Sequence, residues 1–324
     1  IEVCKYMTSN SGCFALITQN SWMFINSFDR LREELIQQNC LSSMLHLGYG
    51  AFGADFGTTA FVFQKKNLLG YYAKYIRLGD FRNIDDKEAN YWNKDVVYLA
   101  RQEDYLTIPR YPFAYWMSIA ARKAFSDGSA LSDISTPRQG MASSDNNRFV
   151  RFWPEVSFSK VGFHSNNAED AQNSGMKWFP YNNGGYYRKW YGINTDLVNW
   201  EKDGLEVKQY AASLYKSFTR TIKSIPYYFQ EGGTWNAISS TSSLSVRYFE
   251  KGFIFSNAGM AIFSTQNEFQ IEYLIGYLNS KVADLFLQYI SPTLNFNQGD
   301  IAQLPIIDSP NKVAAIDITK RCIS

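Results

Sequence analysis

Two strand-like segments joined by a short glycine-rich loop place the strongest constraint on the fold of this chain. Residues 41–47 (LSSMLHL) are short and apolar, and residues 58–64 (TTAFVFQ) carry the β-branched and aromatic side chains typical of strands. The ten residues between them, GYGAFGADFG, are too few to form a crossover helix. The two strands are therefore predicted to be antiparallel members of one sheet.

The loop carries Gly48, Gly50 and Gly53 at the GxGxxG spacing of a dinucleotide-binding turn. Such a turn needs a helix directly after it, because the pyrophosphate sits on the helix N-terminus. The segment that follows Gly53 is strand-like, so no helix is predicted there. The spacing therefore indicates a tight inter-strand loop and not a cofactor-binding turn.

Other patterns predict an α/β arrangement around this loop and mixed structure after it. A strand is expected over 14–20, a surface linker over 65–100, and helices over 27–39 and 112–125. Beyond residue 131, short strand-like runs alternate with turn signals, and 246–264 is expected to form a hairpin or meander. The periodicity of 269–290 predicts one amphipathic helix.

Composition excludes several classes of protein. The two histidines, His46 and His164, are far apart and have no partner ligands, so neither a zinc site nor a histidine-based triad is predicted. No apolar run approaches the roughly 20 residues that span a bilayer, and no membrane partner is predicted. The four cysteines form no CxxC pair, which indicates a reduced, cytoplasmic protein.

The charge distribution is more informative than the net charge of +2. Residues 110–123, 176–192 and 214–224 carry lysine and arginine with no acidic residue, and aromatic side chains are dense in the second stretch. Cations that meet phosphates and rings that stack on bases suit a nucleic-acid groove. Two alternatives stay open on composition alone: a solvated rim above an aromatic core, and an aromatic cleft for a sugar.

Several long motifs in the same order resemble one family. ITQNSWMFINSFDRLREELI followed by TTAFVF is similar to the second half of a gamma-class adenine-N6 DNA methyltransferase domain. Further motifs resemble the target-recognition region of BREX phage-defence methyltransferases of the PglX type; they are residues 138–156, 177–192, 198–208, 231–263 and 278–305.

This resemblance implies an α/β fold class: the closing half of a Rossmann-like methyltransferase sheet, followed by a mixed α+β target-recognition domain. The implied boundaries are 1–75 for the end of the catalytic domain, 76–130 for a linker and helical connector, 131–310 for the recognition domain, and 311–324 for a tail. Since the chain begins at Ile1 within a helical pattern, it is interpreted as part of a longer protein.

For the loop at 48–57, the resemblance implies an aromatic side chain that packs against a flipped-out adenine. Phe52 lies at the matching place, and Phe56 is the competing ring. A base taken out of the stack needs a replacement π-contact, and glycines let the backbone turn tightly beside it. The alternative is that Phe52 is a core residue of a hairpin.

The resemblance also implies a parent enzyme that uses S-adenosylmethionine. The glycine turn that binds this cofactor and the Asn-Pro-Pro-Tyr motif that grips the adenine amine are both absent from the 324 residues. The chain by itself is therefore expected to bind double-stranded DNA but neither the cofactor nor a metal, and to transfer no methyl group. Other BREX proteins are further expected partners.

Residue types in the recognition region suit DNA contacts. Arginine can bind guanine through two hydrogen bonds, and asparagine or glutamine can do so with adenine. The candidates for base contact are Arg138, Gln139, Asn146, Asn147 and Arg148. The candidates for phosphate contact are Lys177, Arg188, Lys189, Thr234 and Arg247. For the first set the alternative is positioning of the DNA backbone. For Lys177, Arg188 and Lys189 it is solvated surface charge, and for Thr234 and Arg247 it is a strand with one solvated face.

The predicted function is thus the base-pocket and target-recognition part of an adenine-N6 DNA methyltransferase. One alternative is a stand-alone DNA-specificity subunit of a restriction-modification system, which has no need of a methyltransferase-like sheet over 1–75. The other is an aromatic-rich carbohydrate-binding module, which needs neither that sheet nor the acid-free basic stretches.

Overall fold

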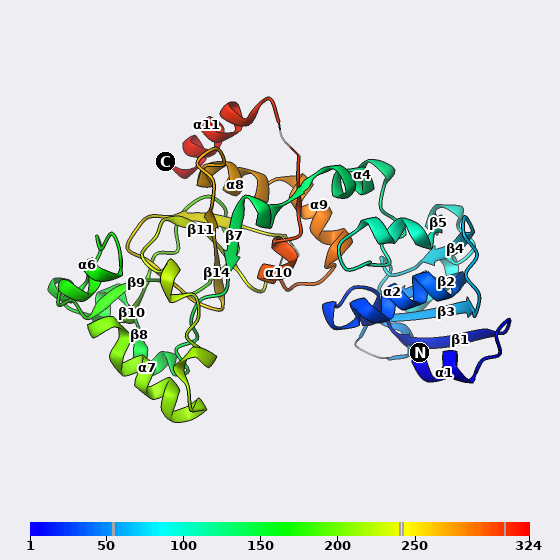
Figure 1. Cartoon of the computed structure of the whole chain (residues 1–324), viewed down its shortest axis with the longest axis horizontal. Coiled ribbons are helices and arrows are strands. Elements are labelled where there is room, and N and C mark those ends of the chain that lie inside the picture. Colours follow the sequence, from blue (N-terminus) through cyan, green and yellow to red (C-terminus); the bar gives the residue numbers. More distant parts are fainter. Residues whose placement is uncertain (54–55, 240, 242, 308) are drawn as a thin grey trace. The chain divides into compact units, whose positions relative to one another are not determined.

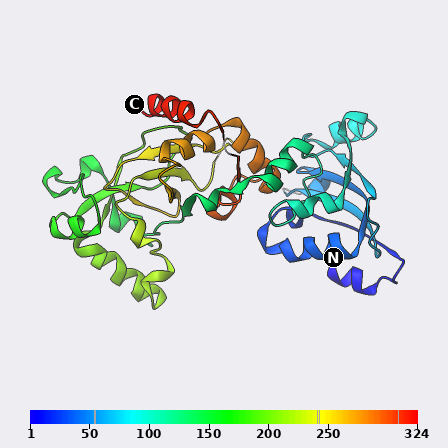
Figure 2. The ribbon, with the colours of Figure 1, turned by 45° about the horizontal axis from the view of Figure 1, so that its top comes forward.

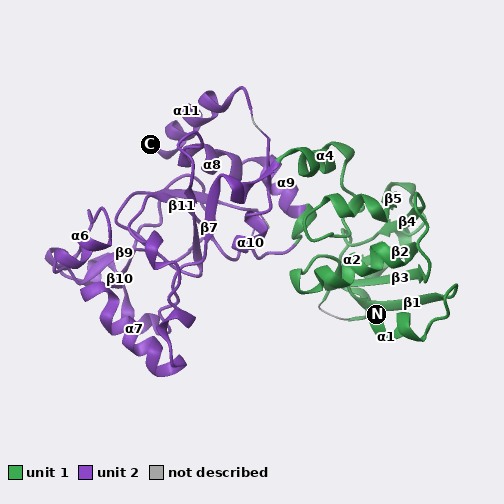
Figure 3. Ribbon diagram, in the orientation of Figure 1, with its two compact units in different colours: residues 1–128, 289–292 green, residues 129–288, 293–324 purple. Residues whose placement is uncertain are grey.

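The structure is a computed structural model that describes residues 1–53, 56–239, 241, 243–307 and 309–324 (Figures 1 and 2). It contains two compact units (Figure 3). The first comprises residues 1–128 and 289–292, and the second comprises residues 129–288 and 293–324.

The first unit is built on a five-stranded sheet of order β1-β3-β2-β4-β5 (Figure 1). Its strands are β1 (Cys13–Gln19), β2 (Cys40–Gly48), β3 (Thr58–Gln64), β4 (Tyr72–Arg77) and β5 (Val97–Arg101). Its helices are α1 (Glu2–Met7), α2 (Asp29–Gln38), α3 (Ile84–Asn90) and α4 (Ile119–Asp127). β3 lies antiparallel between β1 and β2, which confirms the predicted pairing across the glycine loop.

The core of this unit lies on the α2 side of the sheet. Alternate residues of β3 are buried, as expected where one face of a strand packs against a core. Phe61 and Phe63 belong to this set, and their ring centroids are 5.5 Å apart. Leu35 and Ile36 form the buried side of α2. Burial of side chains of this size stabilises a fold by about 1.5–3 kcal/mol each.

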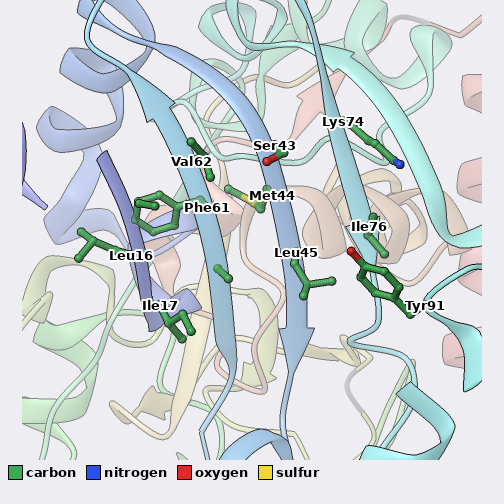
Figure 4. A pocket seen from close by; sticks show the side chains of 12 residues that line it. Leu16, Ile17, Ser43, Met44, Leu45, Phe61, Val62, Lys74, Ile76 and Tyr91 are labelled. Carbon is green, nitrogen blue, oxygen red and sulfur yellow. The ribbon is translucent and has the colours of Figure 1, made fainter. Parts of the chain in front are cut away.

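The opposite face of the same sheet is apolar and open (Figure 4). Ile17, Ala60, Leu45 and Ile76 form one row across β1, β3, β2 and β4. They line a shallow hollow of about 480 Å³, and Ile17 is largely exposed. Since α/β sheets bury apolar faces under a further layer, this face is able to accept one.

Residues 76–128 differ from the expected linker and connector, because they complete the first unit. β5 pairs with β4, and Gln102 then ties this segment to the core. Its side chain accepts from the Leu41 amide at 2.8 Å and donates to the Ile36 carbonyl at 2.8 Å. The polar composition of this segment reflects an edge strand and its turns rather than a surface linker.

The helix expected over 112–125 is shorter than predicted. α4 starts at Ile119, because the Ser118 hydroxyl accepts from the Ala121 amide and caps the helix there. The preceding residues are irregular and bury Phe113 and Tyr115 in the core. The apolar pattern of this stretch thus has two sources, a core segment and a helix.

The second unit has mixed α+β structure, as predicted. Its four-stranded sheets have the orders β13-β9-β10-β8 and β12-β11-β14-β7, and a two-stranded sheet pairs β15 with β6. Its strands are β6 (Ser129–Ala130), β7 (Ser135–Arg138), β8 (Val150–Phe152), β9 (Trp178–Asn182), β10 (Asp196–Asn199), β11 (Gly232–Asn236), β12 (Val246–Phe249), β13 (Ile254–Phe255), β14 (Gly259–Ser264) and β15 (Pro305–Ile306). Its helices are α5 (Asn146–Phe149), α6 (Ala168–Asn173), α7 (Glu201–Tyr215), α8 (Ile271–Leu278), α9 (Lys281–Ile290, whose last two residues belong to the first unit), α10 (Gln298–Ile301) and α11 (Lys312–Ile323).

Three expectations for the second unit are corrected. The helix over 269–290 is two helices, because Asn279 leaves the helix and pairs with the backbone of Val246, accepting from its N–H and donating to its carbonyl at 2.8 Å each. Neither a hairpin nor a meander forms over 246–264, since β11 lies between β12 and β14 and β13 belongs to another sheet. The tail after residue 310 forms α11, which packs against α8 where Gly276 leaves room for Thr319.

Candidate functional site

The carboxyl ends of three strands meet at one edge of the first unit's sheet. β1 and β2 both run antiparallel to β3, and β2 is parallel to β4, so β1, β2 and β4 point in the same direction. Asn20 follows β1, the loop 48–57 starts at the end of β2, and Leu78 follows β4. In open α/β sheets this edge is where ligands bind.

Two glycines of the loop allow its backbone to pack closely against residues 79–82. Gly48 and Gly50 have φ angles of +67° and +78°, which favour glycine. A Cβ on Gly48 would lie 2.5 Å from the Cα of Gly79, and one on Gly50 would lie under 3.0 Å from the Arg82 carbonyl oxygen. The Lys87 ammonium donates to the carbonyls of Leu78 and Phe81, which holds the facing turn. At Gly48 and Gly50 the space is therefore occupied by protein backbone and is not open to a pyrophosphate.

Three aromatic rings project from this loop. Tyr49, Phe52 and Phe56 are 64%, 71% and 44% exposed. Phe52 has a left-handed backbone with φ 57° and ψ 24°, a conformation that costs about 1–2 kcal/mol for a residue with a Cβ. Strain of this kind concentrates at functional sites. Phe52 is therefore not a core residue of the strand pair, which was the alternative considered for it.

A buried polar network lies beside the loop. His46 Nε2 is 3.0 Å from Asn20 Nδ2, and His46 Nδ1 is 3.1 Å from the Tyr115 hydroxyl. Burial, and then the positive charge of Arg77, lower the pKa of His46 to about 4, so the imidazole is neutral at pH 7. A Cβ on Gly57 would lie 2.5 Å from Asn20 Oδ1, so this network also fixes the end of the loop.

Acidification is expected to destabilise the first unit through His46. Its folded-state pKa of about 4 is below the unfolded value near 6.5, so its contribution is complete above pH 6.5 and is lost as pH falls towards 4. The difference corresponds to a loss on the order of 3 kcal/mol. In urea unfolding at several pH values, His46→Gln should be less sensitive to pH in this window than the unchanged protein.

The exposed His164 provides the matched control. His164→Gln should retain the pH dependence of the unchanged protein. If His46→Gln and His164→Gln have the same pH profile, His46 is not the group that titrates.

In the second unit, a depression of about 450 Å³ is lined by polar side chains from α5 and the adjoining β8, and from the ends of β9 and β10. Asn146 and Asn147 come from α5, Arg151 from β8, and Asn183 and Asp196 from the ends of β9 and β10. Asn183 Nδ2 donates to Asp196 Oδ2 at 3.0 Å. The side chain of Asn147 is exposed and forms no hydrogen bond among the described residues. Amide, carboxylate and guanidinium groups are the ones that recognise base edges.

The other candidates for base contact lie in different settings. Arg138 Nη2 donates to the Tyr227 hydroxyl at 3.0 Å, and its guanidinium lies 4.7 Å from the centre of that ring. Gln139 is half-buried, and its backbone carbonyl accepts from Ser224 Oγ at 2.9 Å. Both residues are half-buried and lie outside the lining of the depression that holds Asn146 and Asn147.

Arg148 is engaged in an ion pair. Its Nη2 and Nε lie 2.8 and 3.1 Å from Glu206 Oε1. This hydrogen bond is the main cause that lowers the pKa of Glu206 below its usual value. Arg148 also lies 5.1 Å from the ring centre of Tyr210, so its local role is to attach α5 to α7.

The basic residues of the aromatic segment differ in exposure. Lys177 is half-buried and lies 5.7 Å from the ring centre of Trp178, which Arg151 approaches to 5.9 Å. Arg188 is exposed, and its Nε donates to the Tyr191 carbonyl at 2.6 Å. Lys189 Nζ donates to the Asn279 carbonyl at 2.7 Å.

Thr234 and Arg247 face the interior, which corrects the expectation that they contact phosphate. They are paired residues of β11 and β12, and each is 1% exposed. The Thr234 hydroxyl donates to the Met260 carbonyl, and Arg247 Nη2 donates to Asn236 Oδ1 at 3.2 Å. Burial lowers the pKa of Arg247 to about 10, so it stays charged at neutral pH. The alternation of side chains along a strand defines two faces, but it does not reveal which of them is exposed to solvent.

Sequence reasoning missed six residues at these two places: Asn20, His46, Tyr115, Arg151, Asn183 and Asp196. Asn183 lies within a segment already selected for its basic and aromatic residues, but nothing distinguished it there. Among the described residues there is no group of three or more histidine, cysteine, aspartate or glutamate side chains able to hold a metal. Across the same residues, no helix combines the length and apolar character needed to cross a membrane.

Comparison with known proteins identifies two curated relatives. The adenine-specific methyltransferase PglX of Lacticaseibacillus casei (strain Zhang) is 34% identical over 339 residues, covering 100% of this chain and 27% of the relative. The adenine-specific methyltransferase BrxX of Escherichia coli O9:H4 (strain HS) is 35% identical over 313 residues, covering 93% of this chain and 24% of the relative. The chain thus spans about a quarter of each relative and matches its C-terminal part. No family model matches the chain.

Two solved structures share the fold. The Type IIL restriction-modification enzyme MmeI in complex with DNA has a TM-score of 0.59 and 11% identity over 98% of this chain and 43% of that chain. The Type ISP restriction-modification enzyme LlaGI, a nuclease-deletion mutant in complex with a DNA substrate mimic, has a TM-score of 0.51 and 10% identity over 99% of this chain and 36% of that chain. The sequence relatives thus identify this chain as homologous to the C-terminal part of the adenine-specific methyltransferases PglX and BrxX.

Proposed function

We propose that this chain forms the base-pocket and target-recognition part of a site-specific DNA methyltransferase that modifies adenine N6 in phage defence. The observation that carries the proposal is the loop 48–57, which presents an exposed, strained Phe52 at the carboxyl edge of an α/β sheet. The names of the two relatives and the DNA complexes among the structural neighbours support it.

In this proposal, Phe52 packs against the adenine that leaves the duplex. In the full-length enzyme, Phe52→Ala is expected to lower the methylation rate about tenfold or more, because one base–ring stack contributes about 1–3 kcal/mol. Binding of the duplex should change much less, since phosphate contacts supply most of the affinity. Phe56→Ala is the matched comparison; a larger loss of rate in that variant would transfer the role to Phe56.

The second unit selects the DNA sequence in this proposal, through the depression that holds Asn147 and Asn183. Their amide groups have the donor and acceptor pattern that pairs with adenine, and Asp196 suits the amino group of cytosine. Arg148, Lys177, Arg188 and Lys189 are proposed to contact the DNA backbone. Backbone contacts fix the register of the duplex without conveying sequence.

A selection from random duplexes tests this assignment. The chain is incubated with the pool at two salt concentrations, and bound DNA is recovered and sequenced. We expect an enriched, asymmetric motif that contains adenine. Asn147→Ala and Asn183→Ala should relax the motif at one or two positions, because a good base contact contributes about 1–3 kcal/mol of discrimination.

Asn173→Ala, at the exposed end of α6, is the control and should leave the motif unchanged. Recovery of DNA that depends on salt but shows no enriched motif would mean that the basic residues proposed to contact the DNA backbone bind phosphates and that the chain reads no base. No recovery at low salt would exclude DNA binding by this chain.

The cofactor of the proposed reaction is S-adenosylmethionine, and the glycines present here do not fit it. Gly48 and Gly50 face the backbone of Gly79 and Arg82, which leaves no room for a ligand at these two glycines. The sequence has no Asn-Pro-Pro segment to hold the adenine amine. We therefore propose that the chain by itself transfers no methyl group and that other parts of the longer enzyme supply this chemistry.

The open apolar face of the first unit fits this division of labour. The row formed by Ile17, Ala60, Leu45 and Ile76 needs a covering layer, and the relatives are about four times as long as the chain. This face argues against a stand-alone specificity subunit. Other BREX proteins are proposed partners of the full-length enzyme.

A further inference from the structure

A second hollow in the first unit is not used by the proposed function. It has a volume of about 690 Å³ and lies between the edge strand β5 and the start of α4. This volume falls within the range of about 300–1,000 Å³ that is typical of small-molecule sites. None of its lining residues belongs to the loop 48–57 or to the second unit.

The hollow carries an excess of positive charge. Arg101, Arg122 and Lys123 line it, and Asp104 is the acidic residue among the lining side chains. Lys123 also lies 3.9 Å from Asp127, which is not part of the lining, so three cations face two carboxylates and one positive charge is in excess. Asp104 bridges the two arginines, with Oδ1 at 2.9 Å from Arg101 Nη2 and Oδ2 at 2.9 Å from Arg122 Nη1. One carboxylate therefore orients two guanidinium groups but neutralises only one of them. The Nε of Arg101 is buried and has no hydrogen-bond partner among the described residues.

Aromatic rings form part of the same wall. Tyr72 is 57% exposed, and the guanidinium of Arg101 lies 5.7 Å from its ring centre. Tyr98 and Trp116 also line the hollow, and Arg77 covers Trp116 at 4.5 Å from its ring centre. Planar rings next to guanidinium groups offer stacking surfaces for a base and donors for a phosphate.

From this combination we propose that the hollow binds a nucleoside phosphate. The phosphate is bound by Arg101, Arg122 and Lys123, and the base stacks against Tyr72. A carboxylate beside the cations, Asp104, holds the guanidinium groups in position before the ligand arrives. The ligand is either a free nucleotide or one nucleotide of a DNA strand, since both present a base and a phosphate. The site lies in a different unit from the DNA-reading depression and does not depend on that assignment.

Isothermal titration calorimetry on the whole chain tests the proposal with three ligands: ADP, a five-residue oligothymidylate, and tripolyphosphate. Saturable binding of ADP or of the oligonucleotide is expected. Tighter binding of the oligonucleotide identifies a DNA strand as the source, and tighter binding of ADP identifies a free nucleotide. Absence of saturable binding for both at millimolar concentrations overturns the proposal.

Two variants separate the ring from the cations. Tyr72→Leu is expected to weaken ADP and oligonucleotide binding about tenfold and to leave tripolyphosphate binding within about twofold. Arg122→Gln is expected to weaken all three ligands about tenfold. Both side chains are partly solvated, and circular dichroism verifies that the variants fold.

Arg82→Gln, which alters an exposed arginine outside the hollow, is the matched control. It should change no affinity by more than about twofold. The proposal is rejected if Arg82→Gln weakens binding as much as Arg122→Gln, because the attraction is then unspecific. It is also rejected if Tyr72→Leu leaves ADP binding unchanged, because no base then stacks there.

Discussion

Gly50→Ala is expected to destabilise the first unit by about 3 kcal/mol or more. The φ of Gly50 is +78°, and a Cβ would come closer than 3.0 Å to the Arg82 carbonyl oxygen, so one backbone segment must move. An overlap with backbone is not relieved by rotating a side chain, which places this change in the severe tail of single substitutions. Urea unfolding followed by far-ultraviolet circular dichroism measures the loss.

Gly53→Ala is the matched control in the same loop. Its φ is +66°, but no atom lies within 4 Å of the position of an added Cβ. Only the conformational penalty remains, which is about 1–2 kcal/mol. If both variants lose the same stability, the loop uses its glycines only for φ, and the proposed close packing of residues 48–50 against 79–82 is wrong.

The second large effect is expected at Arg32. This side chain is fully buried in α2 and donates to three carbonyls: Arg110 from Nε and Nη2, and Trp22 and Ile25 from Nη1, at distances of 2.7–2.9 Å. Arg32→Met preserves volume but removes all four of these hydrogen bonds. The Ile25 carbonyl keeps the Phe28 N–H as a donor, and a buried acceptor that loses its donor costs about 1–3 kcal/mol. Burial lowers the pKa of Arg32 to about 10, so relief of its desolvation offsets part of this cost.

The net loss expected for Arg32→Met is about 3 kcal/mol in the free energy of unfolding. Arg30→Met, on the exposed side of the same helix, should change it by less than about 0.5 kcal/mol. Equal effects of the two substitutions would mean that the four hydrogen bonds of Arg32 contribute nothing beyond helix propensity.

The site in the first unit could be predicted in part from the sequence. The loop was located, its cofactor role was excluded, and Phe52 was selected through resemblance to a family. The network of His46, Asn20 and Tyr115 could not be predicted, because its members are 26 and 69 residues apart in sequence and no spacing rule links them. That selection of Phe52 as the stacking ring stays a prediction until the rate of the variant is measured.

In the second unit, residue type alone predicted the site residues less well than in the first unit. Asn146 and Asn147 do line a polar depression, but the same chemical reasoning also selected Thr234 and Arg247, which are buried. Arg148 has the side chain of a base reader and is held by Glu206 instead. Each of these outcomes depends on a neighbour from a distant segment.

By itself, the sequence determined β1, α2, β2, β3 and the antiparallel pairing of β2 with β3. These features follow from periodicity, strand propensity and the length of one loop, all of which act over a few residues. The sequence also carried the long motifs through which the chain resembles PglX and BrxX.

Only the tertiary structure decided where elements stop and which faces are buried. Asn279 ends α8 because its amide is satisfied by the backbone of Val246, and β5 becomes part of the sheet because it pairs with β4. The exposure of the open face of the first unit and the burial of Arg247 also depend on which layers pack against each strand. A strand pattern defines two faces, but the layers that pack against it determine which of them meets water.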